Sequence, residues 1–273
     1  MFISISGTFH VTGYNPDGDS LHFQALNADN WGRLRGRPVR LNRQGQAQLR
    51  LEGIDALELN YEGWHQPLKY AREALDFLLS HLRIRGNLFG PSHARDGAAG
   101  YILARHAEKN RRPVAFVFAG DPPWPDGEKV FLDAALVRQS VNYLLLQEGL
   151  VYPTYYEGLY ADLREELTRG VQAARRERLG LWPRDCSNSG VTMDEGQAGL
   201  EKCVILPKLF RRLVRFIKEN RDISGFKDYL DATPDPAVHL PTGRLTGLAD
   251  LVEVRGNAVK LLAAPEDLVF KES

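Results

Sequence analysis

The chain has 273 residues, of which 43% are hydrophobic and 26% charged, and its 35 basic and 35 acidic residues give a formal net charge of zero. This globular composition argues against intrinsic disorder and against an indiscriminate cationic coat for nucleic acid. A local basic groove stays compatible with zero net charge, because binding depends on where the charges lie. The length suits one large domain, or one of ordinary size with a small one.

The N-terminus alternates like a strand from Phe2 onward, and it carries no basic leader, apolar core or cleavage motif. No apolar run approaches the ~20 residues that a membrane helix needs. The two cysteines, Cys186 and Cys203, lack a paired spacing for zinc, and we interpret them as reduced thiols. We therefore expect a soluble, cytoplasmic protein with no membrane contact.

The first half of the chain predicts mostly strands, because apolar and polar residues alternate. We expect strands over 3–12, 21–26, 47–54, 100–105 and 114–118, with a turn at 15–18 and a hairpin loop at 107–112. A helix is predicted over 68–79, since its apolar residues fall at helical spacing behind Pro67.

Helical patterns dominate the second half. They cover 136–148 and 159–179, and Gly149 and Gly180 follow them directly, as expected at helix C-termini. Strands followed by terminal helices favour an α+β fold over a doubly wound sheet. Further on, we expect a helix over 203–220 and a hairpin around Val254–Val259.

Two pairs of acidic residues are candidates for a catalytic or metal-binding site. Asp17-Gly-Asp19 lies at the turn between the first two strands, although such a sequence is often an ordinary turn. Arg50 lies in a later strand, and Asp55 and Glu58 follow at the end of that strand. Hard divalent cations prefer oxygen ligands, and a guanidinium suits a phosphate oxygen. These residues predict a metal site beside a phosphate site; the alternative is a solvated strand end with a surface ion pair.

Five segments, in sequence order, match one known pattern. They are Asp17-Gly-Asp19-Ser, Leu49-Arg-Leu-Glu-Gly-Ile-Asp55-Ala-Leu-Glu58, Glu108–Phe118, the Val-Asn-x-x-Leu helix at Ser140–Leu150, and Ala173–Trp182. Together they resemble the staphylococcal nuclease (thermonuclease) family over roughly residues 3–185. The resemblance implies an α+β fold with a five-stranded OB-type β-barrel and packed helices, plus a small C-terminal α+β module. It also implies hydrolysis of DNA or RNA phosphodiesters with Ca²⁺, or alternatively with Mg²⁺ or Mn²⁺.

The resemblance assigns a role to individual acids. Asp19, Asp55 and the backbone carbonyl of Ala56 would hold the metal ion. Glu58 would orient or deprotonate the attacking water, as a general base does. Each of these residues is present in the sequence.

The resemblance also assigns the substrate contacts. Arg50 and Arg112 would clamp the phosphate and stabilise the charge gained in the transition state. Arg111 adjoins Arg112, so a slip of one residue would exchange their roles, and we count Arg111 and Asp17 among the substrate-binding candidates.

Two tyrosines follow the helix that ends at Gly149. Tyr152 and Tyr155 are candidates for stacking on a base of a single strand. The alternative is that these rings pack between helices.

The predicted helix over 206–218 has apolar residues on one arc and basic residues on the opposite arc. We call the latter the basic arc: Lys208, Arg211, Arg212, Arg215 and Lys218. It could contact nucleic acid or an acidic protein partner. The alternative is the solvated face of a helix that is docked by its apolar side.

Every segment that matches the nuclease pattern lies before residue 186. We therefore expect a nuclease-like domain over 1–185, a polar linker over 186–202, and an accessory module of unknown function over 203–273 that supplies no catalytic group.

Two functions follow from these patterns. The first is a metal-dependent endonuclease or exonuclease on DNA or RNA, with single strands preferred. The second is a catalytically weak or inactive OB-fold module that binds nucleic acid or protein. The presence of Asp19, Asp55 and Glu58 together with both arginines favours the hydrolase. A nuclease in the cytoplasm needs restraint, through low free Ca²⁺, the C-terminal module or narrow specificity.

Overall fold

The computed structural model describes residues 1–11, 16–84, 96–194, 196–220 and 222–272, so the predicted turn at 15–18 lies partly outside the described residues. The chain folds into two units whose segments alternate along the sequence. Unit 1 comprises Met1–Glu52, Leu75–Leu145 and Ala161–Leu167. Unit 2 comprises Gly53–Ala74, Leu146–Tyr160 and Thr168–Ser273.

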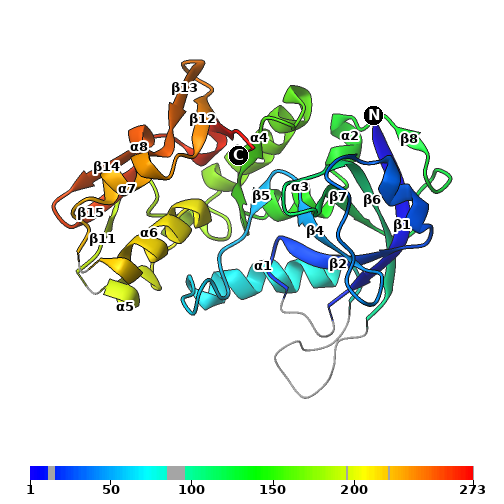
Figure 1. Ribbon diagram of the computed structural model, residues 1–273, viewed down its shortest axis with the longest axis horizontal. Helices are drawn as coiled ribbons and strands as arrows, with labels where there is room; N and C mark the ends of the chain where they lie inside the picture. Colours follow the sequence, from blue (N-terminus) through cyan, green and yellow to red (C-terminus); the bar gives the residue numbers. More distant parts are fainter. Residues whose placement is uncertain (12–15, 85–95, 195, 221, 273) are drawn as a thin grey trace. The chain divides into compact units, whose positions relative to one another are not determined.

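Unit 1 contains a closed five-stranded β-barrel, drawn as blue to green strands in Figure 1. Its strands are β1 (Phe2–His10), β2 (Ser20–Ala25), β4 (Ala47–Leu51), β6 (Ala98–Ala107) and β7 (Pro113–Ala119). They pair in the order β1-β2-β4-β7-β6, and β6 returns to β1. This closure, together with the helices, confirms the predicted α+β fold with an OB-type barrel. The short strands β3 (Arg35–Gly36) and β8 (Lys129–Val130) extend the sheet at β6 and β1.

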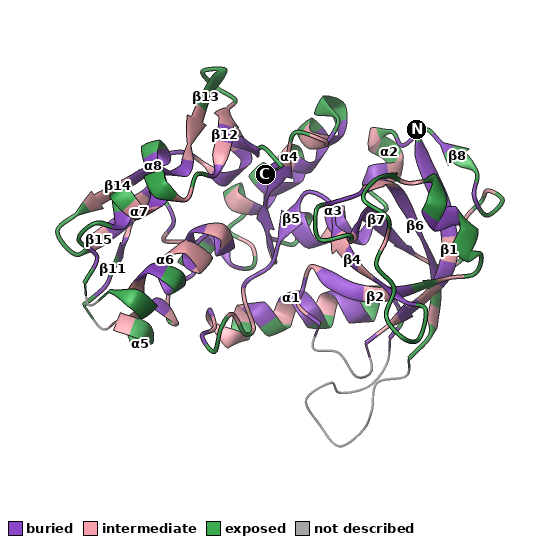
Figure 2. Ribbon diagram, in the orientation of Figure 1, coloured by how far each residue is buried: buried purple, intermediate pink, exposed green. Residues whose placement is uncertain are grey.

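Alternation along each strand builds the barrel core. In β2 and β4, Leu21 and Leu49 are fully buried and face each other across the ladder. Their neighbours His22 and Gln48 also pair, but they are only half-buried, so they lie on the outer face. Figure 2 shows the resulting buried positions along the barrel strands. Each fully buried leucine stabilises the fold by roughly 1.5–3 kcal/mol, so the pattern that predicts these strands also fixes their register.

Four helices follow the predicted pattern with one difference. They are α1 (Leu68–His81), α2 (Ala134–Val137), α3 (Val141–Gln147) and α4 (Ala161–Arg176). The single helix predicted over 136–148 is therefore interrupted between α2 and α3. Ser140 causes the break locally: its hydroxyl donates to the Val137 carbonyl at 2.6 Å and accepts from the Tyr143 N–H at 3.2 Å. A serine in this position offers the backbone an alternative to the continuous helical ladder.

The remaining elements of unit 2 are short. They are β5 (Ile54–Asp55), β9 (Tyr152–Pro153), β10 (Tyr155–Tyr156), η2 (Trp182–Arg184), β11 (Val191–Thr192), α5 (Gly196–Leu200), α6 (Pro207–Glu219), α7 (Phe226–Ala232), β12 (Pro236–His239), β13 (Arg244–Gly247), α8 (Leu248–Leu251), β14 (Val252–Arg255), β15 (Ala258–Leu261), η3 (Pro265–Asp267) and β16 (Leu268–Phe270). The hairpin β14–β15 confirms the one expected around Val254–Val259. The segment predicted as a linker contains β11 and α5. A 3₁₀ helix, η1 (Ala28–Arg33), belongs to unit 1.

Residues from the expected accessory module bond to earlier segments within unit 2. Strand β16 pairs in parallel with β10. The guanidinium of Arg175 donates two hydrogen bonds to the carboxylate of Glu266, at 2.7 and 2.9 Å. These contacts tie residues 203–273 to segments 146–160 and 168–176. The domain boundaries at 185 and 203 stay a prediction.

Two sequence-wide features are seen in the described residues. Cys186 and Cys203 are free cysteines. Within the described ranges, no helix is long and apolar enough to span a membrane.

Candidate functional site

The barrel places the turn with Asp17 and Asp19 next to β4, the strand that contains Arg50. The N–H of Ser20 donates to the Asp17 carbonyl at 3.4 Å, which closes a turn over residues 17–20, and the N–H of Leu51 donates to the Asp19 carbonyl at 3.1 Å. Ser20 faces Arg50 across the β2–β4 ladder. The turn with Asp19 therefore lies beside the end of β4, one residue away from the partner of Arg50.

The second arginine lies just before β7, the strand on the other side of β4. Arg50 pairs with Val114 of β7, and Arg112 lies two residues before Val114. The Nε of Arg112 donates to the Glu108 carboxylate at 3.0 Å. Burial raises the pKa of Glu108, but the backbone N–H of Asn110 and the Arg112 guanidinium outweigh it, and the pKa stays below its usual value. Glu108 is therefore a carboxylate at neutral pH, and it orients Arg112.

Arg111 and Arg112 differ in their surroundings. Arg111 is exposed, has a φ of 66°, and its Nε donates to the Pro38 carbonyl at 2.9 Å. Its own carbonyl accepts from the N–H of Arg40 at 2.9 Å. Arg111 is thus engaged with the segment before β4, whereas Arg112 lines a cavity. This difference favours Arg112 over Arg111 for the phosphate clamp.

An open cavity of about 740 Å³ lies on unit 1 next to Arg112. Its lining residues are polar or basic apart from one leucine: His22, Arg40, Leu41, Asn42, Arg43, Gln46, Gln48, Asn110 and Arg112. No carboxylate is among them. The cavity therefore combines a positive potential with amide hydrogen-bonding groups, which suits an anionic ligand.

Unit 2 holds the second acidic pair. Asp55 lies in β5, opposite Tyr152 of β9, and is buried. Gln66, which is also buried, fixes the loop after β5: its amide oxygen accepts from the Glu58 N–H at 3.2 Å, and its N–H donates to the Glu58 carbonyl at 2.9 Å. The carboxylates of Asp55 and Glu58 are thereby held near one point.

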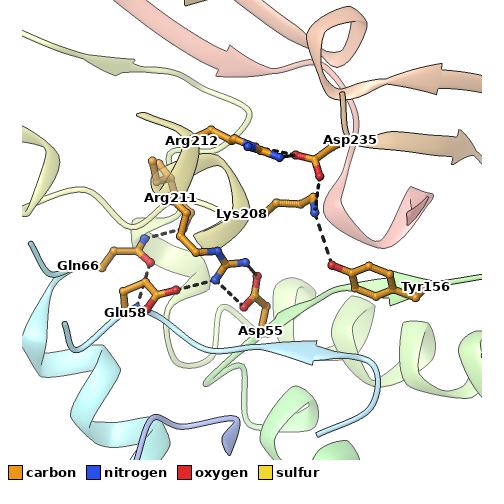
Figure 3. A network of polar contacts seen from close by, with 9 residues as sticks. Asp55, Glu58, Gln66, Tyr156, Lys208, Arg211, Arg212 and Asp235 are labelled. Carbon is orange, nitrogen blue, oxygen red and sulfur yellow. Dashed lines mark hydrogen bonds and ion pairs between the residues drawn. The ribbon is translucent and has the colours of Figure 1, made fainter. Parts of the chain in front are cut away.

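An arginine from α6 occupies that point, as Figure 3 shows. The guanidinium of Arg211 contacts Asp55 at 3.1 and 2.8 Å, and it contacts Glu58 at 2.6 Å. Burial lowers the pKa of Arg211, but the two carboxylates outweigh it and raise the pKa well above its usual range. Sequence reasoning placed Arg211 on the basic arc but did not connect it with the acids, because this contact spans 156 positions.

The rest of the basic arc also pairs within unit 2. Lys208 and Arg212 contact the carboxylate of Asp235 at 3.1 and 2.6 Å (Figure 3). The two basic residues nearest the end of α6 contact Glu62 at 3.4 and 3.3 Å. These ion pairs give every residue of the basic arc a carboxylate partner within unit 2, and contact of the arc with nucleic acid or a protein partner stays a prediction.

The tyrosines expected to stack on a base are fully buried. The hydroxyl of Tyr152 donates to the Asp185 carboxylate at 2.7 Å, and burial together with that carboxylate raises the pKa of Tyr152 well above its usual value. The hydroxyl of Tyr155 shares a hydrogen bond of 3.0 Å with Thr168. A ring with no exposed face cannot stack on a nucleotide, which favours the packing alternative for both residues.

The oxygen donors of unit 2 bear on whether it can hold a metal ion. Asp55 and Glu58 supply the hard oxygens that Ca²⁺ prefers, and Arg211 shows that a cationic group can contact both at once. Among the described residues, no cluster of three or more His, Cys, Asp or Glu side chains forms a metal site. Asp55 and Glu58 therefore fit a divalent cation by donor type only, and the Arg211 guanidinium contacts both of them.

A closed five-stranded barrel with helices, carrying acids and arginines at strand ends, defines an OB-type fold of the nuclease kind. A sequence model described as staphylococcal nuclease homologue matches residues 48–184, half of the chain. The chain belongs to this family, which relates it to nucleases. A search of curated proteins finds no match to the chain.

Proposed function

We propose that the protein is a divalent-cation-dependent hydrolase of phosphodiester bonds in DNA or RNA, acting in the cytoplasm, with Ca²⁺ as the first cation to test. One observation carries the proposal. Within unit 1, the turn with Asp19 lies next to Arg50 of β4, and Arg112 lies two residues before Val114, which pairs with Arg50. Membership of the nuclease family supports it. An acid beside two guanidiniums suits a substrate whose phosphate is held by cationic groups.

The proposed chemistry assigns a step to each group of residues. Arg50 and Arg112 bind the non-bridging phosphate oxygens and stabilise the charge that they gain as water adds to phosphorus. Glu58 accepts a proton from that water, the bond to the leaving oxygen breaks, and the leaving oxygen takes a proton from the solvent. Asp19, Asp55 and the Ala56 carbonyl would hold the cation. A divalent cation, when bound, supplies further charge stabilisation at the phosphate.

A second function is favoured by a specific observation. Arg211 engages both Asp55 and Glu58, and a protein in which this contact is permanent would bind nucleic acid without cleaving it. In that case the barrel would act as a binding module.

A matrix of substrates and cations separates the two functions. The full-length protein is incubated with end-labelled single- and double-stranded DNA and RNA, in Ca²⁺, Mg²⁺, Mn²⁺ or EDTA. We expect cleavage with at least one cation and none in EDTA. Arg50→Ala should lower the rate by ~10²–10³, whereas the exposed Arg244→Ala should leave it unchanged. Binding without cleavage under every condition would favour the binding module, and cleavage that persists in EDTA would contradict metal dependence.

A further inference from the structure

The segment that precedes β4 is strongly basic. Residues 30–51 contain six arginines and neither aspartate nor glutamate. Asp29 and Glu52 flank this segment on either side, so the positive charge is concentrated within it. A run of this kind is the electrostatic signature of a surface that binds a polyanion.

The basic segment is held in a fixed conformation. The N–H of Arg40 donates to the Arg111 carbonyl at 2.9 Å, and Leu41 forms a bridge with Ala47. The side-chain oxygen of Asn42 accepts from the N–H groups of Gln44 and Gln46, at 3.0 and 2.9 Å. Because these bonds order the loop, it presents its arginines without a further folding cost on binding.

Arg40 and Arg43 line the cavity beside Arg112. In the described part of the chain, neither of these two side chains forms an ion pair. Arg112 does pair with Glu108, but that carboxylate is buried and is not among the lining residues. The cavity therefore holds cationic groups that are not neutralised at its surface, together with amides such as Gln48.

We propose that this cavity binds the phosphate backbone of a nucleic-acid strand next to the bond that is cleaved. The choice of ligand rests on the proposed function, and the geometry adds a subsite built from Arg40 and Arg43. Arg35 and Arg37 continue the basic segment outside the cavity lining, which suits a chain with repeated charges better than a single small anion. Each phosphate contact releases counterions, so the affinity should depend steeply on salt.

The test measures binding without cleavage. Fluorescence anisotropy of a labelled oligothymidylate in EDTA compares the full-length protein, the double variant Arg40→Ala/Arg43→Ala and the control Arg244→Ala. Each phosphate contact with a single strand contributes about 0.7 to the slope of log K against log salt, so the loss of two contacts should lower the slope by about 1.4. The loss of affinity in the double variant should therefore be roughly 25-fold larger at 0.1 M salt than at 1 M salt. An unchanged slope, or an equal loss in Arg244→Ala, overturns the subsite. Tight binding without cleavage in any cation would overturn the proposed function alone.

Arg211 supports a second and independent inference within unit 2. One of its terminal nitrogens contacts both carboxylates, Asp55 at 3.1 Å and Glu58 at 2.6 Å (Figure 3). A calcium ion would need an Asp55 oxygen at about 2.3–2.6 Å, and the Glu58 carboxylate would have to be released to act on the attacking water. A guanidinium and a divalent cation cannot both occupy this space, and their like charges also repel each other.

The backbone that carries Arg211 is firmly attached. The Gln66 amide donates to the Ile205 carbonyl at 2.8 Å, and the N–H of Leu206 donates to the Ser187 hydroxyl at 2.9 Å. These bonds fix the start of α6, and its apolar side is buried at Phe210 and neighbouring positions. The Arg211 side chain is 28% exposed, so a change of its rotamer would take the guanidinium off the acids without a movement of α6.

We infer that Arg211 and a divalent cation are alternative partners of the Asp55 carboxylate, and that Arg211 also occupies Glu58 while it is in place. Through Arg211, α6 lowers the cation affinity of this site and so restrains the proposed nuclease when free Ca²⁺ is low. The inference rests on the proposed function for the identity of the cation.

Calorimetric titration of the full-length protein with Ca²⁺ tests the competition. Arg211→Gln should bind Ca²⁺ at least about tenfold more tightly than the wild type, because the competing charge is gone. Arg211→Lys should fall between them, since it keeps the charge but loses the fork. The control Arg215→Gln also removes one positive charge from α6. That charge pairs with Glu62, so the control should bind Ca²⁺ like the wild type.

Circular dichroism establishes that each variant is folded before titration. Equal Ca²⁺ affinity in the wild type and Arg211→Gln overturns the competition, even if cleavage is observed. An equal gain in Arg215→Gln also overturns it, since a long-range charge effect would then suffice. The expected difference in affinity without any cleavage would contradict only the proposed function.

Discussion

Replacing Asn142 should destabilise unit 1 because this side chain joins a helix to two barrel strands. Asn142 lies in α3 and is fully buried. Its amide nitrogen donates to the carbonyls of Glu52 and Ala115, at 2.9 and 3.0 Å, and its oxygen accepts from the N–H of Val117 at 3.0 Å. The chain leaves the barrel after Glu52 on its way to Asp55, so Asn142 also fixes where that exit lies.

The magnitude follows from counting the groups that lose their partners. In Asn142→Ala, the Ala115 carbonyl keeps the N–H of Glu52 at 2.9 Å, whereas the Glu52 carbonyl and the Val117 N–H lose the bonds from Asn142. Each buried unsatisfied group costs ~1–3 kcal/mol, so we expect a loss of about 2–6 kcal/mol in the free energy of unfolding. Asn142→Asp should cost at least as much, because a carboxylate cannot donate to two carbonyls.

Urea unfolding followed by circular dichroism and tryptophan fluorescence measures this loss. With a slope of roughly 2–3 kcal/mol/M, the midpoint should fall by about 0.7–3 M. Gln147→Ala, an exposed change in the same helix, should stay within ~0.5 kcal/mol of the wild type. A midpoint for Asn142→Ala within ~0.2 M of the wild type would refute the reasoning.

Two further predictions concern unit 2. Burial raises the pKa of Asp235, but Lys208 and Arg212 outweigh it and lower the pKa below its usual value. Its contribution to stability is therefore present above the ordinary aspartate pKa of roughly 3.9 and is lost as the pH falls through the lowered folded value. The stability gap between wild type and Asp235→Asn in urea should be largest at pH 7 and shrink toward pH 3; a gap independent of pH would show that the sign is wrong. Truncation after residue 202 removes the strand β16, which pairs with β10, and Glu266, which pairs with Arg175. We therefore expect an aggregated or poorly folded product by gel filtration. A soluble, folded product would instead support a separate accessory module.

Local patterns account for the elements that the sequence predicts well. Alternation of Leu21 with His22 and of Leu49 with Gln48 predicts strands because one face of each strand fills the barrel. The break at Ser140 is harder to foresee, since the apolar spacing of α2 and α3 continues across it. There a hydroxyl group competes with the helical ladder.

The contacts of the acids could not be predicted from the sequence. The basic arc is a sound local interpretation, but its partners Asp55, Glu58 and Glu62 lie more than a hundred positions away. No periodicity encodes a pairing at that separation. The tyrosines show the same limit, because the hydrogen bond from Tyr152 to Asp185 depends on how distant segments pack.

The measurement that tests the central claim most directly is the single-turnover rate of Glu58→Gln on an end-labelled oligonucleotide at saturating Ca²⁺. Glutamine keeps the size of the side chain but cannot accept the proton of the attacking water. The account predicts a loss of ~10²–10⁴ in rate with the fold unchanged, while Glu219→Gln, an exposed change at the end of α6, cleaves like the wild type. A Glu58→Gln protein that cleaves at the wild-type rate would contradict the proposed hydrolase site.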